Sequence, residues 1–261
     1  MTGSFKEELL QRSEDANSCL ILALDVTTQM SNHSKRWKEK RRSLTRQAIR
    51  VIEETAPELA ALKFNHQLVL PLGIFSEEMA QIMDAADELP KIMDCKANDV
   101  GHTNRWIAQH YFDAGFDALI ANPLVGFRGG IEEISHVAKE RERGLILLCV
   151  MSHPGAKFSF TREFVDKSGP VPAYQLIARN ATQWGAHGLI VGGTYPELVQ
   201  QVRSLIPRDM LIISPGLGAQ GGNGTGLRTA GTDYFIVGRS IFDAENPYKA
   251  AKKYRNLSIE Q

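Results

Sequence analysis

Short apolar runs recur along the chain, and each is followed by a longer segment in which apolar residues repeat at helical spacing. Strands of a parallel sheet are covered by helices on both faces, so they are almost wholly apolar. The runs therefore predict eight strands, at residues 20–25, 61–65, 91–96, 118–122, 144–152, 187–193, 211–216 and 234–240. The intervening segments predict amphipathic helices, among them residues 43–56, 104–114, 173–184 and 195–204.

Eight β-α units in a chain of 261 residues predict an α/β fold, a single-domain (β/α)8 TIM barrel. The barrel domain is expected to span residues 1–261, with a short helical lead-in at about residues 1–18. An open, doubly wound parallel sheet is the alternative, although it usually contains fewer strands.

Composition indicates a globular protein, since 43% of the residues are hydrophobic, 23% are charged, and 30 basic residues balance 30 acidic ones. A net charge of zero does not favour nucleic acid or a membrane surface as a partner. The basic run at residues 35–42 is therefore interpreted as a solvated lead-in to the first helix after the first strand, rather than as an RNA-binding patch.

The cysteines and the amino-terminal segment bear on location. Cys19, Cys95 and Cys149 are too few and too scattered for a disulfide framework. Residues 1–17 carry four acidic side chains and do not have the pattern of a signal peptide. No apolar run approaches the roughly 20 residues that cross a bilayer. We expect a cytoplasmic protein.

Polar and charged residues collect where the predicted strands end. They are Asp25, Lys63, Asn65, Asp94, Lys96, Asn122, Ser152, Gly192, Gly193, Ser214 and Arg239. In a (β/α)8 barrel, catalytic residues come from the carboxyl ends of the strands. This distribution favours an active site at that rim.

The segment Asp94-Cys95-Lys96-Ala97-Asn98-Asp99 places three charges at the end of one apolar strand. Alternate residues of a strand share a face, so Asp94 and Lys96 are expected to point the same way. Burying such charges is costly unless they pair or take part in chemistry. A structural ion pair is the alternative, but the other polar strand ends favour catalysis.

A glycine-rich segment at residues 214–226 follows the seventh predicted strand. Glycines allow backbone N–H groups to surround an anion. The segment contains G-x-G-x-x-G, but the next strand ends in Gly238-Arg239-Ser240 and not in the acidic residue of a dinucleotide site. A phosphomonoester site, with Arg239 on the phosphate and a loop that closes over it, is the better interpretation.

No metal site is predicted. The seven histidines show no paired ligand spacing, and Lys63 and Lys96 would repel a divalent cation placed beside Asp94.

Several motifs in this order resemble the orotidine 5′-monophosphate decarboxylase family, over about residues 20–242. They are Asp25, Lys63, Asp94-x-Lys96-x-x-Asp99, Met151-Ser152-His153-Pro154-Gly155, Ser214-Pro215-Gly216-Leu217-Gly218-Ala219-Gln220 and Val237-Gly238-Arg239-Ser240. Two elements depart from the family pattern: Val100-Gly101-His102-Thr103-Asn104, which retains the threonine, and Asn65, where glycine is frequent.

The resemblance implies a carboxy-lyase of pyrimidine (UMP) biosynthesis that converts orotidine 5′-monophosphate to uridine 5′-monophosphate without a cofactor. Lys96 would stabilise the carbanion left at C6 and protonate it. Lys63, Asp94 and Asp99 would hold Lys96 in position.

The resemblance also assigns contacts to the substrate. Asp25 and Lys63 would bind the ribose hydroxyls, and Ser152 the pyrimidine edge. Gln220 would bridge base and phosphate, while Gly238 and Arg239 would grip the phosphate. Asn65, Thr103 and Pro215 complete the expected binding set.

In this family the loop that carries Asp99 and Thr103 reaches the neighbouring subunit, which implies a homodimer with shared sites. Spacing alone equally allows Asp99 to serve its own chain. Two other functions are alternatives: a Mg²⁺-dependent decarboxylase or aldolase of keto-sugar phosphates, which shares D-x-K-x-x-D, and a non-catalytic nucleotide-binding barrel.

Overall fold

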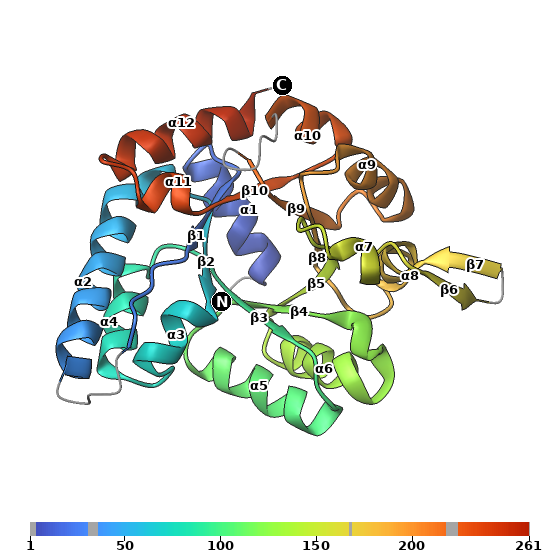
Figure 1. Ribbon diagram of the computed structural model, residues 1–261, viewed down its shortest axis with the longest axis horizontal. Helices are drawn as coiled ribbons and strands as arrows, with labels where there is room; N and C mark the ends of the chain where they lie inside the picture. Colours follow the sequence, from blue (N-terminus) through green and yellow to red (C-terminus); the bar gives the residue numbers. More distant parts are fainter. Residues whose placement is uncertain (1–3, 31–35, 167–168, 218–223, 261) are drawn as a thin grey trace.

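The computed structural model describes residues 4–30, 36–166, 169–217 and 224–260. Eight parallel strands close into a barrel in the order β1-β10-β9-β8-β5-β4-β3-β2 (Figure 1). They are β1 (Leu20–Leu24), β2 (Ala61–Asn65), β3 (Lys91–Ala97), β4 (Ala118–Ala121), β5 (Gly144–Val150), β8 (Gly188–Val191), β9 (Leu211–Pro215) and β10 (Tyr234–Val237). The predicted barrel is confirmed, and the open doubly wound sheet is wrong.

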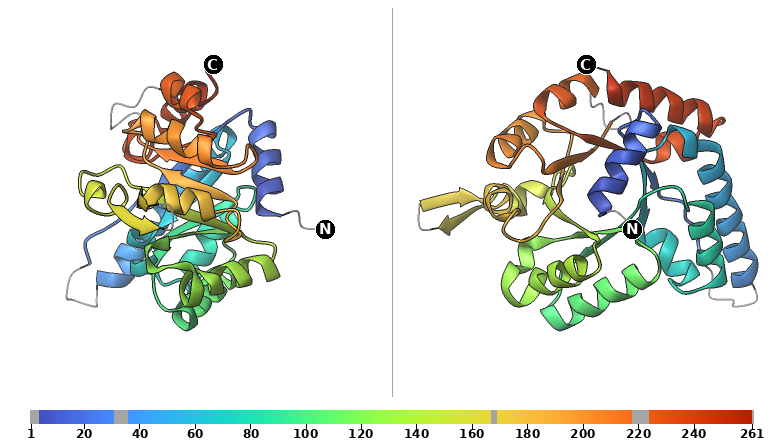
Figure 2. Two further views of the ribbon diagram at one scale, coloured as in Figure 1. Left: turned by 90° about the vertical axis from the view of Figure 1, so that its right-hand side faces the viewer. Right: turned by 180° about the vertical axis from the view of Figure 1, so that it is seen from behind.

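The helices form a ring outside the barrel (Figures 1 and 2). Buried apolar residues of the helices and of the strands form one core cluster. The longer helices are α2 (Trp37–Thr55), α4 (Glu77–Ala85), α5 (Gly101–Asp113), α6 (Glu132–Glu140), α8 (Ala173–Asn180), α9 (Pro196–Leu205) and α12 (Pro247–Ile259). Shorter segments are α3 (His66–Leu72), α7 (Ala156–Ser159), α10 (Gly224–Ala230), α11 (Arg239–Phe242), η2 (Ala56–Glu58), η3 (Pro123–Val125) and η4 (Phe127–Ile131).

Some predicted boundaries were wrong. Helix α2 begins at Trp37, so most of the basic run forms its first turns and is not a lead-in; these turns expose their charged side chains or bury them only partly. The regular helix predicted to reach residue 184 ends at Asn180 and continues as turns. Strand β5 ends at Val150, two residues before Ser152.

Helix α1 (Phe5–Asp15) lies across the amino-terminal end of the barrel (Figure 2, right). Phe5 and Leu9 are buried there. A Cβ added to Gly144, at the start of β5, would lie 2.4 Å from the Phe5 ring, so only glycine leaves room for that ring. The predicted helical lead-in therefore closes one end of the core.

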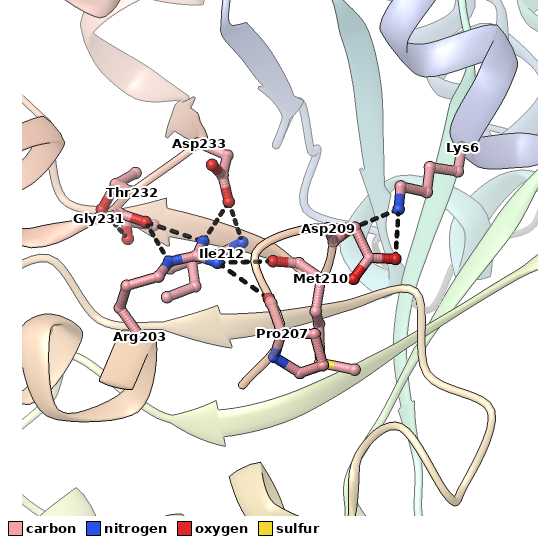
Figure 3. A network of polar contacts seen from close by, with 10 residues as sticks. Lys6, Arg203, Pro207, Asp209, Met210, Ile212, Gly231, Thr232 and Asp233 are labelled. Carbon is pink, nitrogen blue, oxygen red and sulfur yellow. Dashed lines mark hydrogen bonds and ion pairs between the residues drawn. The ribbon is translucent and has the colours of Figure 1, made fainter. Parts of the chain in front are cut away.

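Polar contacts link the loops at this same end (Figure 3). Arg203 on α9 pairs with Asp233 and donates to the carbonyl oxygens of Met210 and Gly231. Lys6 on α1 pairs with Asp209 at 3.2 Å. The opposite end of the barrel, where the strands finish, holds a cavity.

A two-stranded antiparallel hairpin, which the sequence analysis missed, interrupts the β-α order after β5. It consists of β6 (Glu163–Asp166) and β7 (Gly169–Pro172), and it projects from the side of the barrel (Figure 1). Most residues of the barrel strands are buried, whereas all four residues of β6 are exposed.

Candidate active site

The carboxyl end of β3 departs from regular strand geometry. Met93 pairs with Leu119 and Ala97 with Ala121, so three residues of β3 lie between these pairs where β4 has one. Lys96 lies in this bulge with a φ of 47°, a left-handed conformation that is uncommon outside glycine. Strained backbone of this kind concentrates at functional sites, where surrounding structure maintains it.

The bulge places two lysines around one carboxylate. The Nζ atom of Lys63, from β2, lies 2.9 Å from Asp94 Oδ2, and Nζ of Lys96 lies 2.7 Å from Asp94 Oδ1. Burial raises the pKa of Asp94, but the charges of Lys63 and Lys96 lower it further, and the net pKa lies below the ordinary value. Asp94 is therefore a carboxylate held between two ammonium groups.

These charges line a cavity of about 280 Å³ at the carboxyl ends of the strands. Nine of the expected site residues line it: Asp25, Lys63, Asn65, Asp94, Lys96, Ser152, Pro215, Gly238 and Arg239. They come from the ends of β1, β2, β3, β9 and β10 and from the segment after β5. The structure thus brings together residues that span more than 200 positions of the chain.

Asp25 lies within this cavity with an unmet acceptor. Its Oδ1 atom is buried and accepts no hydrogen bond within the described residues. Such a group is costly unless a ligand donates to it. A Cβ added to Gly238 would lie 3.2 Å from Asp25 Oδ2, so glycine permits this close approach.

Two polar residues at strand ends, Asn65 and Ser214, differ in where their side chains lie. Asn65 lines the cavity, and its side chain also caps α3. Ser214 is fully buried away from the cavity, and its hydroxyl lies 2.8 Å from that of Thr232. Ser214 thus lies at the end of β9, as predicted, but does not line the cavity.

Asp99 and Thr103 do not line the cavity of their own chain. Asp99 is exposed, and its Oδ1 atom accepts from the Val100 N–H at 2.7 Å. Within the described residues the ion pairs of Lys63 and Lys96 are made with Asp94 and not with Asp99. The row of charged side chains in the cavity of one chain, here called the charge row, thus consists of Lys63, Asp94 and Lys96.

The buried side chain of Asn104 holds the Asp99 loop, and the sequence analysis missed it. Its Oδ1 accepts from the Asp99 N–H at 3.2 Å, and its Nδ2 donates to the Asp99 carbonyl at 2.6 Å and to that of Gly130 at 3.0 Å. An asparagine directly after the Thr103 of the motif was the available signal.

The sequence analysis also missed the apolar walls of the cavity. These are Ile120, Leu148, Ile190 and Ile236, together with Met151 and Leu217. Each strand residue among them looks like ordinary core in the sequence, so no local signal marks it. Gln220 and the rest of residues 218–223 lie outside the described residues.

No group of three or more histidine, cysteine, aspartate or glutamate side chains within the described ranges is placed to hold a metal ion. At Asp94, both oxygens already accept from ammonium groups. This donor set suits an anionic ligand better than a divalent cation.

The closed parallel barrel, with charged residues at the carboxyl rim and Arg239 beyond the last strand, defines a (β/α)8-barrel enzyme with a site for a small anionic substrate. The chain belongs to the orotidine 5′-phosphate decarboxylase / HUMPS family, whose model matches residues 18–254.

Curated relatives agree with this membership. The orotidine 5′-phosphate decarboxylase of Methanosarcina barkeri is 35% identical over 239 residues, which cover 92% of this chain and 94% of the relative. That of Thermococcus kodakarensis is 36% identical over 244 residues, covering 93% and 98%.

Solved structures show the same architecture. Orotidine 5′-phosphate decarboxylase from Pyrococcus horikoshii OT3 superposes with a TM-score of 0.72 at 29% identity, covering 93% of this chain and 100% of that one. The Methanocaldococcus jannaschii enzyme, complexed with inhibitor BMP, gives a TM-score of 0.76 at 26% identity and covers 93% and 99%.

Proposed function

We propose that this protein decarboxylates orotidine 5′-monophosphate to uridine 5′-monophosphate, the reaction named for its curated relatives. One observation carries the proposal: Lys96 is held at 2.7 Å from Asp94 on a strained bulge that faces the cavity. The reaction needs a fixed ammonium group at that place.

The chemistry breaks the bond between C6 and the carboxylate carbon, and CO₂ leaves while the electron pair remains on C6. The Lys96 ammonium stabilises this negative charge and then transfers a proton to C6. Lys63 and Asp94 position Lys96, and Asp99 of the partner subunit completes the charge row. These steps require no cofactor.

The remaining residues have binding roles in the proposal. Asp25 and Lys63 bind the ribose hydroxyls, and the orphaned Oδ1 of Asp25 supports this assignment. Ser152 contacts the pyrimidine edge, with Asn65 and Pro215 beside the substrate. Gly238, Arg239 and Gln220 bind the phosphate end, where remote binding energy drives closure over the substrate.

A homodimer with shared sites is part of the proposal. Asp99 and Thr103 lie outside their own cavity. Helix α5, which contains Thr103, also carries part of an exposed aromatic cluster. Trp106 is 50% exposed and stacks on His110, which Phe75, 63% exposed, contacts edge-on. Exposed apolar clusters of this kind mark interfaces between proteins.

An absorbance assay with orotidine 5′-monophosphate, with and without EDTA, tests the proposal. We expect equal turnover in both, and turnover at least about 10³-fold lower with Lys96→Ala. No turnover of orotidine 5′-monophosphate, together with Mg²⁺-dependent and EDTA-sensitive turnover of a keto-sugar phosphate, would favour the keto-sugar-phosphate alternative. Nucleotide binding without turnover would favour the non-catalytic barrel.

The location we propose is the cytoplasm. Cys19, Cys95 and Cys149 are free thiols, as in reducing compartments. No helix of the described chain is long and apolar enough to span a bilayer.

A further inference from the structure

The hairpin of β6 and β7 has no role in the proposed reaction. It projects away from the barrel (Figures 1 and 2). None of its described residues lines the cavity. Phe164 is 47% exposed and Val165 is 89% exposed. An isolated two-stranded hairpin is marginally stable in water. An exposed hairpin of this kind would be stabilised by pairing with a further strand.

The two outer edges of the hairpin differ chemically. Ala173 N–H donates to the Arg162 carbonyl at 2.9 Å, and Phe164 lies opposite Val171 two positions along. Hydrogen-bonded pairs alternate with non-bonded pairs in an antiparallel ladder. The backbone groups of Phe164 therefore face the partner strand β7, whereas those of Glu163 and Val165 face outward.

The same alternation turns Pro170 and Pro172 outward on β7, since they lie opposite Val165 and Glu163. Proline has no N–H, so the outer edge of β7 offers no donor at either position, which blocks a further strand. The outer edge of β6 offers both an N–H and a carbonyl at Glu163 and at Val165. The outer edge of β7 is therefore closed to a further strand, and the outer edge of β6 is open to one.

We propose that β6 pairs antiparallel with β6 of a second copy of this chain, which joins two hairpins into a four-stranded sheet. One symmetric register uses both outward-facing residues: Glu163 of each chain lies opposite Val165 of the other. That register places Phe164 opposite Phe164 of the partner subunit, at the two-fold axis.

The same register places Arg162 opposite Asp166 of the partner subunit. Two-fold symmetry repeats the contact, so the interface gains two ion pairs of opposite charge between facing residues. A shift by two residues in either direction would pair Glu163 or Val165 with itself and leave half of the outward groups unused. Backbone pairing and charge therefore select the same register.

This contact lies apart from the exposed cluster around Trp106 (Figure 1), so it adds a second two-fold interface to any assembly that the rest of the molecule forms. A monomer would become a dimer. A dimer would become a tetramer, which closes when the hairpin axis meets the first two-fold axis at a right angle. The proposed association through β6 does not depend on whether orotidine 5′-monophosphate is the substrate.

Sedimentation velocity over a range of concentrations tests the proposal. Arg162→Asp and Asp166→Arg should each weaken the doubling by about tenfold or more, because each turns both attractive pairs into repulsive ones. An equimolar mixture of the two variants should recover it, since every facing pair is then opposite in charge. Arg46→Asp, an exposed charge reversal on α2, is the matched control and should change nothing.

Val165→Pro provides a second test, because it removes one outward N–H and leaves the bonds within the hairpin. It should abolish the doubling while circular dichroism and turnover stay unchanged. The proposal is overturned if the wild-type protein shows no doubling, or if the two charge variants do not complement each other. Loss with Val165→Pro but indifference to both charge reversals would also overturn the proposed register.

Discussion

Strand β3 begins and ends beside a buried aspartate, and the two clusters make a matched pair. At its amino-terminal end, Asp117 lies between Lys91 and Arg143, with side-chain exposures of 9%, 12% and 32%. At its carboxyl end, Asp94 lies between Lys63 and Lys96, with exposures of 10%, 7% and 35%. Burial and charge count therefore do not distinguish the two clusters.

Their hydrogen bonds and backbone do distinguish them. Asp117 accepts the Lys91 backbone N–H at 2.8 Å, and the Lys91 ammonium donates to the Leu89 carbonyl at 3.0 Å. Asp94 accepts from ammonium groups, and Lys96 has a positive φ. The Asp117 cluster links the ends of neighbouring strands, whereas Lys63, Asp94 and Lys96 of the other cluster line the cavity. This agrees with the general separation of stability and catalysis between the two ends of such barrels.

Lys96→Ala gives the largest expected effect. Turnover of orotidine 5′-monophosphate should fall by at least about 10³-fold, because the proton donor and the cation at C6 are both lost. Binding of uridine 5′-monophosphate should survive better than turnover. Steady-state kinetics and a binding titration measure both.

Lys91→Ala is the matched control on the same strand. It should lower stability and leave turnover close to the wild-type value. Near-normal turnover in Lys96→Ala, or equal losses in the two variants, would remove the distinction between the clusters.

Asp99 extends the comparison across subunits. Lys96→Ala and Asp99→Ala should each be nearly inactive, yet a mixed dimer contains one site with both defects and one with neither. Random exchange of equal amounts should restore about a quarter of wild-type activity, because half of the dimers are mixed. Confirmed mixed dimers without recovery would show that Asp99 serves its own chain.

Arg239→Ala should have an intermediate effect. Loss of a charge-assisted contact to phosphate should lower kcat/KM by roughly 1.5–3 kcal/mol equivalent or more. Orotidine without its phosphate should be a poor substrate that is almost indifferent to the change. If both substrates lose equally, Arg239 has a role other than phosphate binding.

The smallest effect concerns acid stability. The pKa of Asp94 is lowered in the folded protein, so its charge contributes stability above its unfolded pKa of about 3.9, and that contribution is lost as pH falls through the folded value. Asp94→Asn should cost about 1–3 kcal/mol near neutral pH. The difference from wild type should shrink below pH of about 4. Urea unfolding at several pH values measures it, and a pH-independent difference would contradict the prediction.

The strands were predictable because hydrophobic periodicity is local. All eight predicted barrel strands are present, since a strand covered on both faces must be apolar along its whole length. The hairpin escaped prediction because β6 is short and exposed and β7 alternates proline with small residues. Neither carries the signal of a buried strand.

The expected substrate-site residues came from strand ends and motifs, and nine of them share one cavity. The positive φ of Lys96 is not encoded by the residue type, because lysine disfavours it; the bulge against β4 imposes it. The place of Asp99 was likewise undecided, because spacing along the chain does not say where a loop beyond the barrel rim points.

The sequence by itself determined the number of barrel strands, their parallel arrangement in a barrel and the charged residues at the strand ends, because each depends on local pattern and on the common direction of parallel strands. The tertiary structure alone decided the pairing of Asp94 with both lysines, the exposure of Asp99 and the open edge of β6. These depend on which segments pack together and in which register, and that is settled by barrel closure and not by any one stretch of chain.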